Sequence, residues 1–167
     1  MNDQSIRSIE AAEVSPGTTL SAALLALNNA HAQELSWLEP ERLQHLVRES
    51  FYARRIGDLD AFLIAFDQDA RYDSPNFLWF RDRYERFAYV DRVVVSASAH
   101  GQGLGRRLYE KLFADARAAG YPCIVAEVNT VPANPGSLSF HDKMGFETVG
   151  DLTFSPDKSV RYFARSL

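Results

Sequence analysis

Apolar residues recur along this chain with two different spacings, which separate the expected helices from the expected strands. A spacing of three to four residues predicts an amphipathic helix, and three segments have it. A fourth helix is expected from its end signals, with Asn134 and Pro135 at its start and Gly145 as its stop. In the longest, Leu104, Leu108 and Leu112 lie on one line while charged residues fall elsewhere, and Gly120 follows as a helix end. One expected helix begins at Thr18 or Thr19, and a second runs from Pro40 to a stop at Gly57. Two more cover residues 103–119 and 135–144.

Short runs of β-branched and aromatic residues, bounded by turn residues, predict the strands. The expected strands cover residues 5–14, 61–66, 77–80, 87–95, 123–128, 146–154 and 160–163. The resulting order, β-α-α-β-β-β-α-β-α-β-β, indicates an α/β fold built on a mixed sheet. Because no repeat, low-complexity tract or linker interrupts this order, residues 1–167 are expected to form one domain.

The composition excludes several classes of protein. The 18 Lys and Arg residues against 22 Asp and Glu residues leave a formal net charge of −4, so we expect no nucleic-acid partner. No apolar run approaches the ~20 residues of a membrane span, and the first residues lack the apolar segment of a secretory signal. We therefore expect no membrane partner and a cytoplasmic location. The single cysteine, Cys123, excludes an intramolecular disulfide and a multi-cysteine metal site.

No other group of residues predicts a metal site. Residues 67–78 superficially resemble a calcium loop, but Tyr72 stands where that loop needs glycine and Leu78 where it needs glutamate. The four histidines, at positions 31, 45, 100 and 141, show no ligand spacing. We therefore predict no metal.

Glycines alternate in the turn between the strand at 87–95 and the helix at 103–119. Gly101, Gly103 and Gly105 let successive backbone N–H groups converge, and the helix N-terminus adds a partial positive charge at the same place. Such a turn can hold a pyrophosphate without a lysine. The spacing G-x-G-x-G departs from the G-x-G-x-x-G of dinucleotide-binding turns, and the Gly-Lys-Ser/Thr of a Walker loop is missing. Glycines that merely ease a tight turn are the remaining alternative.

The segment His100–Gly105 resembles the coenzyme A-binding motif of the GNAT superfamily of N-acetyltransferases, Arg/Gln-x-x-Gly-x-Gly/Ala, with histidine in place of Arg or Gln. The resemblance implies a mixed, mostly antiparallel central sheet flanked by helices, and acetyl-CoA as the acyl donor. It implies that backbone amides of residues 101–106 hold the pyrophosphate, while residues 93–95 pair with the pantetheine arm as an extra strand would. The residues expected to bind the donor are Val93, Val94, Val95, His100, Gly101, Gln102, Gly103, Leu104, Gly105, Arg106, Asn134, Ser137 and Phe140.

A second motif resembles the same family. The stretch from Asn134 to Phe146 follows the family's N-x-x-A-x-x-x-Y-x-x-x-G-F signature, with Ser137 in place of the alanine and His141 in place of the tyrosine. In the family that tyrosine lies beside the thioester sulfur and protonates the departing thiolate. Because a histidine can donate a proton near neutral pH, the resemblance implies an acid at His141. A plain pocket-lining role is the alternative.

Two carboxylates are candidates for the base that removes the amine's proton. In the family this base lies on the strand before the glycine turn or on the next strand, where Asp91 and Glu127 are found. Asp91 could instead pair with Arg92 or Arg86 on the sheet surface. Strand alternation places Glu127 and Asn129 on one face, so both belong to the site if that face lines the cleft.

The acceptor is expected to bind beside the aromatic segment that precedes the central strands. Asn76 and Trp79 can form an aromatic, hydrogen-bonding wall, and Tyr89 and Asn129 complete the predicted substrate-binding set. The sequence therefore predicts an N-acetyltransferase that moves an acetyl group from acetyl-CoA to a small-molecule or peptide amine by direct attack in a ternary complex. Dimers are common in the family, so a homodimer is a further expectation. The alternatives are a coenzyme A-binding sensor or interaction module without catalysis, and a nucleotide-binding oxidoreductase.

Overall fold

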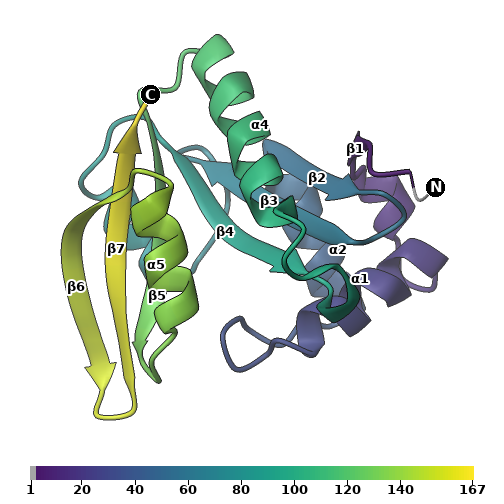
Figure 1. The fold of residues 1–167 in the computed structure, drawn as a ribbon, viewed down its shortest axis with the longest axis horizontal. Helices are drawn as coiled ribbons and strands as arrows, with labels where there is room; N and C mark the ends of the chain where they lie inside the picture. The colour runs from purple at the N-terminus through teal and green to yellow at the C-terminus, as the bar shows by residue number, and fades with distance from the viewer. Residues whose placement is uncertain (1–2) are drawn as a thin grey trace.

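Seven strands form one open sheet in the computed structural model, which describes residues 3–167 (Figure 1). Their order is β1-β2-β3-β4-β5-β7-β6, and neighbours are antiparallel except for β4 and β5. This confirms the mixed, mostly antiparallel sheet. The strands are β1 (Ile6–Ser8), β2 (Tyr52–Ile56), β3 (Ala61–Asp67), β4 (Ala88–Val95), β5 (Cys123–Val131), β6 (Glu147–Ser155) and β7 (Lys158–Ser166).

Helices cover both faces of this sheet. Among the helices of residues 3–167, none is long and apolar enough to cross a membrane. The helices are α1 (Thr19–Asn29), α2 (Pro40–Glu49), α3 (Pro75–Arg81), α4 (Leu104–Ala118) and α5 (Pro135–Lys143), with short 3-10 turns η1 (Ala11–Val14) and η2 (Ala97–Ala99).

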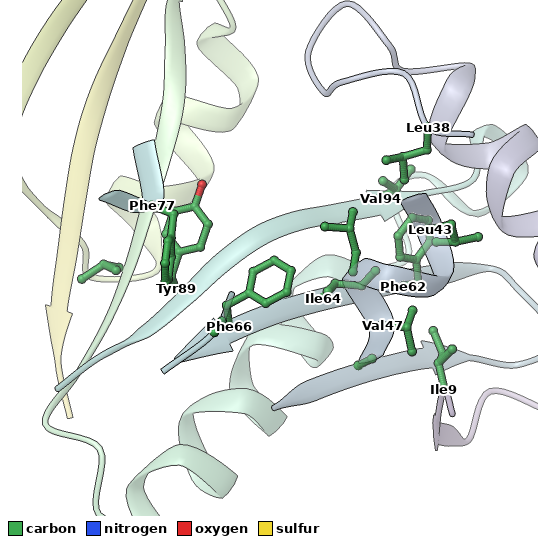
Figure 2. Close-up of a cluster of buried hydrophobic side chains, with 14 of the residues drawn as sticks. Ile9, Leu38, Leu43, Val47, Phe62, Ile64, Phe66, Phe77, Tyr89 and Val94 are labelled. Carbon is green, nitrogen blue, oxygen red and sulfur yellow. The ribbon is translucent and has the colours of Figure 1, made fainter. Parts of the chain in front are cut away.

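Strand alternation divides the core into two clusters, one on each face of the sheet. Along β3, Phe62, Ile64 and Phe66 pack into the cluster on the α1 and α2 side, which Figure 2 shows. Leu63 points the other way and joins the cluster under α4, which includes buried Leu108. Because β3 is buried on both faces, its sequence is an unbroken apolar run instead of an alternating one.

The prediction of a strand at residues 77–80 is wrong, because these residues lie in α3. Pro75 supplies a first helical residue whose missing N–H costs nothing there, and the Leu78 N–H donates to the Ser74 carbonyl. The aromatic residues that suggested a strand instead pack one helical face into the core, with Phe77 and Phe80 fully buried.

The helix expected to continue to Gly57 is also shorter than predicted. It ends at Glu49, and residues 52–56 form β2, which pairs with both β1 and β3. The first strand is likewise short, because residues 11–14 form η1. The observed order is therefore β-α-α-β-β-α-β-α-β-α-β-β. The number of strands, seven, agrees with the prediction, but β2 replaces part of a predicted helix and α3 replaces a predicted strand.

The parallel pair of β4 and β5 is short, and this positions the site. Its ladder places Ala88 and Tyr89 opposite Ile124 and Val125, after which the two strands separate. β3 accompanies β4 as far as Val95, whereas β5 continues beside β7. The glycine turn and α4 follow β4, and α5 follows β5, so elements from both strands flank the space between them (Figure 1).

Candidate active site

A cleft of about 890 Å³ occupies the space where β4 and β5 separate. Its walls come from residues 90–95 of β4, residues 126–129 of β5, the glycine turn, and one face each of α4 and α5. Residues 31–35, which follow α1, close one side. Three residues predicted to be catalytic line this one cleft: Asp91, Glu127 and His141.

The glycine turn presents unpaired backbone donors to the cleft. Gly101 and Gly103 have φ angles of 78° and 72°, in the left-handed region that favours glycine, and Gly103 is the N-cap of α4. Within the described chain, the N–H groups of residues 101–106 donate to no backbone carbonyl. These donors and the helix N-terminus form a site suited to an anion. Gly105 instead lies where a Cβ would touch Phe140 at 3.8 Å.

The residues predicted to bind the donor line the cleft, with one exception. Gln102 is exposed, and its side chain accepts a hydrogen bond of 2.9 Å from Gln4 outside the cleft wall. His100, which replaces Arg or Gln of the motif, lies at the rim with Nε2 3.1 Å from the Val95 carbonyl. Past Tyr89, β4 has no strand partner on its β5 side, so the backbone of residues 93–95 is available to an extended ligand.

Glu127 has one carboxylate oxygen held and the other unpaired. Its Oε1 accepts hydrogen bonds from the Tyr89 hydroxyl at 2.8 Å and from Asn76 Nδ2 at 3.2 Å. Its Oε2 is buried and has no partner among the described residues. Burial, and secondly the negative charge of Asp91, raises the pKa of Glu127 to about 8. This carboxyl can therefore lose and regain a proton near neutral pH.

Asp91 has both oxygens occupied. Oδ1 accepts from the Tyr72 hydroxyl at 2.5 Å, and Oδ2 accepts from Arg92 Nε at 2.6 Å. Arg92 also donates to Asn28 Oδ1 at 2.8 Å, and its side chain is only 3% exposed. The pairing with Arg92 thus exists, but it is buried and ties β4 to α1 instead of lying on the surface.

The contacts of His141 fix the tautomer of its neutral imidazole. Nδ1 lies 2.8 Å from the Ser137 carbonyl, which can only accept, so Nδ1 carries the proton. Nε2 therefore accepts from the Tyr109 hydroxyl at 2.8 Å. Burial lowers the pKa of His141 and raises that of Tyr109. Tyr109 lines the cleft from α4, and sequence reasoning missed it because no motif marks it.

Two of the residues predicted to bind the acceptor support Glu127, and a third packs elsewhere. Asn76 and Tyr89 are its hydrogen-bond donors and do not line the cleft themselves. Trp79 stacks on Tyr162 at 4.1 Å between ring centroids, outside the cleft wall. The aromatic segment therefore lies behind the carboxylate, and its contact with an acceptor stays a prediction.

Asn129 lines the cleft and connects three segments. Its Oδ1 accepts from Lys158 Nζ of β7 at 2.6 Å, and its Nδ2 donates to the Glu34 carbonyl at 3.4 Å. The segment after α1 is thereby joined to the two strands across one end of the cleft. No group of three His, Cys, Asp or Glu residues in positions 3–167 could hold a metal ion.

Comparisons with known proteins bear on both the sequence and the fold. The model of the Acetyltransferase (GNAT) family matches residues 34–146. Among curated proteins, no sequence matches this chain.

Several solved structures have the same fold. The ribosomal-protein-S18-alanine N-acetyltransferase from Escherichia coli has a TM-score of 0.68 at 16% identity, over 98% of this chain and 93% of its own. The ribosomal-protein-alanine N-acetyltransferase from Brucella melitensis has a TM-score of 0.68 at 21% identity, over 98% and 99%. The yncA protein from Salmonella typhimurium, solved with its cofactor acetyl-CoA, has a TM-score of 0.68 at 16% identity, over 99% and 94%. At these identities the likeness shows the fold alone.

Proposed function

We propose that this chain, which belongs to the Acetyltransferase (GNAT) family, transfers an acetyl group from acetyl-CoA to an amine by direct attack within a ternary complex. The observation that carries the proposal is the pairing of two features in one cleft. Unpaired backbone N–H groups at residues 101–106 suit a pyrophosphate, and Glu127 presents an unpaired carboxylate oxygen. A binding module without catalysis would need the first feature and not the second.

The donor is held chiefly by backbone in this proposal. The amides of the glycine turn bind the pyrophosphate, and residues 93–95 of β4 bind the pantetheine arm along its unpaired edge. Because these contacts use main-chain groups, the histidine at position 100 is compatible with donor binding. Acetyl-CoA supplies an activated acetyl group with a thiolate leaving group.

The acceptor amine reacts at the Glu127 end of the cleft. As its nitrogen attacks the thioester carbonyl carbon, an N–H proton passes to Glu127 Oε2, directly or through one water. The carbon–sulfur bond then breaks with its electron pair on sulfur. Asp91 is not the base in this scheme, because Tyr72 and Arg92 occupy both its oxygens. Its charge instead keeps the pKa of Glu127 high.

The departing sulfur lies on the side of His141 and Tyr109 in this proposal. His141 was predicted as the acid, but its ring proton is directed at the Ser137 carbonyl. The Tyr109 proton is likewise directed at His141 Nε2, and burial raises the pKa of this hydroxyl. We therefore assign Tyr109 a hydrogen bond and no proton transfer: its hydroxyl turns from His141 to the sulfur as the carbon–sulfur bond breaks, and the thiolate takes its proton from water. Both side chains line the cleft, as this role requires.

The acceptor amine reaches this end of the cleft beside Glu34 and Glu127, and it loses the extra proton of its ammonium form to solvent before it attacks. The two ribosomal-protein acetyltransferases with this fold are named for protein alanine acceptors, so peptides belong in any test. The decisive experiment measures thiol release from acetyl-CoA across amino acids, diamines and short peptides, with coenzyme A binding followed by calorimetry. Turnover that is lost in Glu127→Gln supports the proposal. Coenzyme A binding without turnover of any acceptor supports the sensor alternative instead.

A further inference from the structure

Glu127 Oε1 accepts two hydrogen bonds, which leaves the carboxyl one position for a proton. The Tyr89 hydroxyl and Asn76 Nδ2 both donate to Oε1, at 2.8 and 3.2 Å. A carboxyl oxygen has two lone pairs, so these two donors occupy both of them. When Glu127 is neutral, its proton therefore lies on Oε2, which has no partner among the described residues. Oε2 is also the oxygen that the proposed reaction uses.

The amide of Asn76 can donate to Glu127 in one orientation only. An ionised carboxylate accepts hydrogen bonds and donates none, so the amide must direct Nδ2 at Glu127. Its oxygen Oδ1 then faces β7, where it accepts a hydrogen bond of 2.8 Å from the Tyr162 hydroxyl. Both ends of the amide are thus paired. Without the Tyr162 hydroxyl, the end that faces β7 would lose its partner and the orientation would no longer be fixed.

The Tyr162 ring is itself held by packing against α3 and β6. Trp79 stacks on it with 4.1 Å between ring centroids and an interplanar angle of 17°. Asn76 and Trp79 are three positions apart in α3, so they lie on one helical face and both reach Tyr162. Gly150 of β6 stands opposite Tyr162 in the sheet, and a Cβ there would lie 2.7 Å from the Trp79 indole. Three elements therefore set the position of this hydroxyl.

Neither Asn76 nor Tyr162 carries a charge at neutral pH, because burial raises the pKa of Tyr162 to about 12. The other titratable groups that face Glu127 are Tyr72, Tyr89, Asp91 and Tyr109. Burial raises the pKa of each of these tyrosines, and Asp91 is paired with Arg92. A change in Glu127 that follows a substitution of Asn76 or Tyr162 therefore reports hydrogen bonding and not a removed charge.

We propose that Asn76 and Tyr162 are positioning residues that confine the exchangeable proton of Glu127 to Oε2. Asn76 acts on Glu127 directly, and Tyr162 acts through Asn76, which it contacts across 86 positions of the chain. The inference rests on the proposed function, because it takes Glu127 to be the base. Neither residue lines the cleft, so this role requires no contact with acetyl-CoA or with the acceptor.

The test follows the titration of Glu127 by carbon NMR of the full chain, with ¹³C in the glutamate carboxyls and the signal assigned from Glu127→Gln. Asn76→Leu keeps the size of the side chain and removes the donor to Oε1. Because that bond stabilises the ionised carboxylate, the midpoint should rise by about one pH unit. Tyr162→Phe should raise it about half as far. The kcat/KM at pH 7 should accordingly fall about tenfold and about threefold, with the KM for acetyl-CoA nearly unchanged.

Tyr121→Phe is the matched control, since it removes a tyrosine hydroxyl that donates to Asp67 at the same 2.8 Å, away from the cleft. It should leave the midpoint and the rate unchanged. An unmoved or lowered midpoint in Asn76→Leu would overturn the assignment, because packing that is merely loosened admits water and lowers it. If wild type acetylates no amine, the proposed function fails, and the NMR midpoints still decide whether Asn76 and Tyr162 control the Glu127 proton.

A double variant covers the case in which Asn76→Leu fails to fold. Asn76→Leu combined with Tyr162→Phe leaves no buried hydroxyl without a partner, so it costs less stability than the single change. Its midpoint should match that of Asn76→Leu, because Tyr162 acts only through Asn76. A midpoint equal to that of wild type would overturn the assignment.

Discussion

Replacing Glu127 by glutamine tests the proposed base with the smallest change in shape. The amide keeps an oxygen that can accept from Tyr89 and Asn76, but it cannot take a proton from the amine. A general base contributes about 10²–10⁴-fold to rate, so kcat/KM at pH 8 should fall by that factor. The KM for acetyl-CoA should change little, because the proposed donor contacts are made by the glycine turn and β4.

The pH dependence follows from the pKa of about 8 for Glu127. Below that pH the carboxyl is mostly protonated and cannot act as a base. About one-tenth is ionised at pH 7 and one-half at pH 8. The kcat/KM should therefore rise about tenfold per pH unit below pH 7, rise about fivefold between pH 7 and 8, and then level off. Asp91→Asn removes a neighbouring negative charge that raises this pKa, so the rising limb should move to lower pH. The acceptor's own ionisation is the same in both enzymes, so the shift between them reports Glu127.

The same pKa predicts a change in stability. The folded state raises the pKa of Glu127 above its ordinary value of 4.5, so between pH 4.5 and 8 the folded chain binds more protons than the unfolded chain. This contribution to the free energy of unfolding is complete below pH 4.5 and is lost as the pH rises through 8. Denaturant unfolding of Glu127→Gln should therefore show less loss of stability over that range than wild type.

Two results would refute the reasoning on Glu127. One is a Glu127→Gln enzyme with the wild-type rate at pH 8, which would remove this carboxylate from the chemistry. The other is an unmoved pH limb in Asp91→Asn, which would mean that another group titrates. Glu85→Gln, an exposed carboxylate before β4, is the control and should match wild type in rate and in pH profile.

Three further predictions concern the glycine turn, the leaving-group side and the packing of α3. Gly103→Val should abolish coenzyme A binding measured by calorimetry, because it strains a φ of 72° and places a side chain among the N–H donors. The control is Gly17→Val, at a φ of 92° away from the cleft, which should be similarly strained and still bind coenzyme A normally. Tyr109→Phe and His141→Phe should each lower kcat by about 10²-fold or more with a nearly unchanged KM for acetyl-CoA, and an unchanged kcat would remove that residue from the mechanism. Gly150→Ala should lower the free energy of unfolding by about 1–3 kcal/mol, because its Cβ would lie 2.7 Å from an indole carbon on α3; unaltered denaturant unfolding would contradict this packing.

The parts of the fold that could be predicted are those whose signal is local. In α4, leucine recurs at a helical spacing. In the turn before it, the alternating glycines indicate a backbone whose successive N–H groups converge. The segment 77–80 was misread because aromatic residues suit both strands and buried helix faces, and Pro75 was the deciding signal. β2 was merged with the preceding helix because Phe51 extends that helix's apolar stripe and the next glycine, a typical helix stop, is Gly57.

The candidate site could be predicted only where a motif marks it. Asp91, Glu127 and His141 were found through their strands and the second motif, and all three line the cleft. Tyr109 could not be found, because its place in the site depends on a contact between two helices that lie far apart in the sequence. The sequence also does not show which of the candidate residues takes which catalytic role. Whether Asp91 or Glu127 is the available carboxylate depends on Tyr72, 19 residues from Asp91 in the chain.

The overall charge of the chain proves to be a poor guide to the anions it can hold. A net charge of −4 argues against a broad polyanion surface, yet the glycine turn can bind a pyrophosphate with backbone dipoles and no net charge. Glu34 and Glu127 lie in the lining of the same cleft, whereas Asp91 is paired there with Arg92. The placement of these groups within one cleft, more than the total charge of the chain, therefore fits an anionic donor beside a carboxyl that can take a proton from an amine.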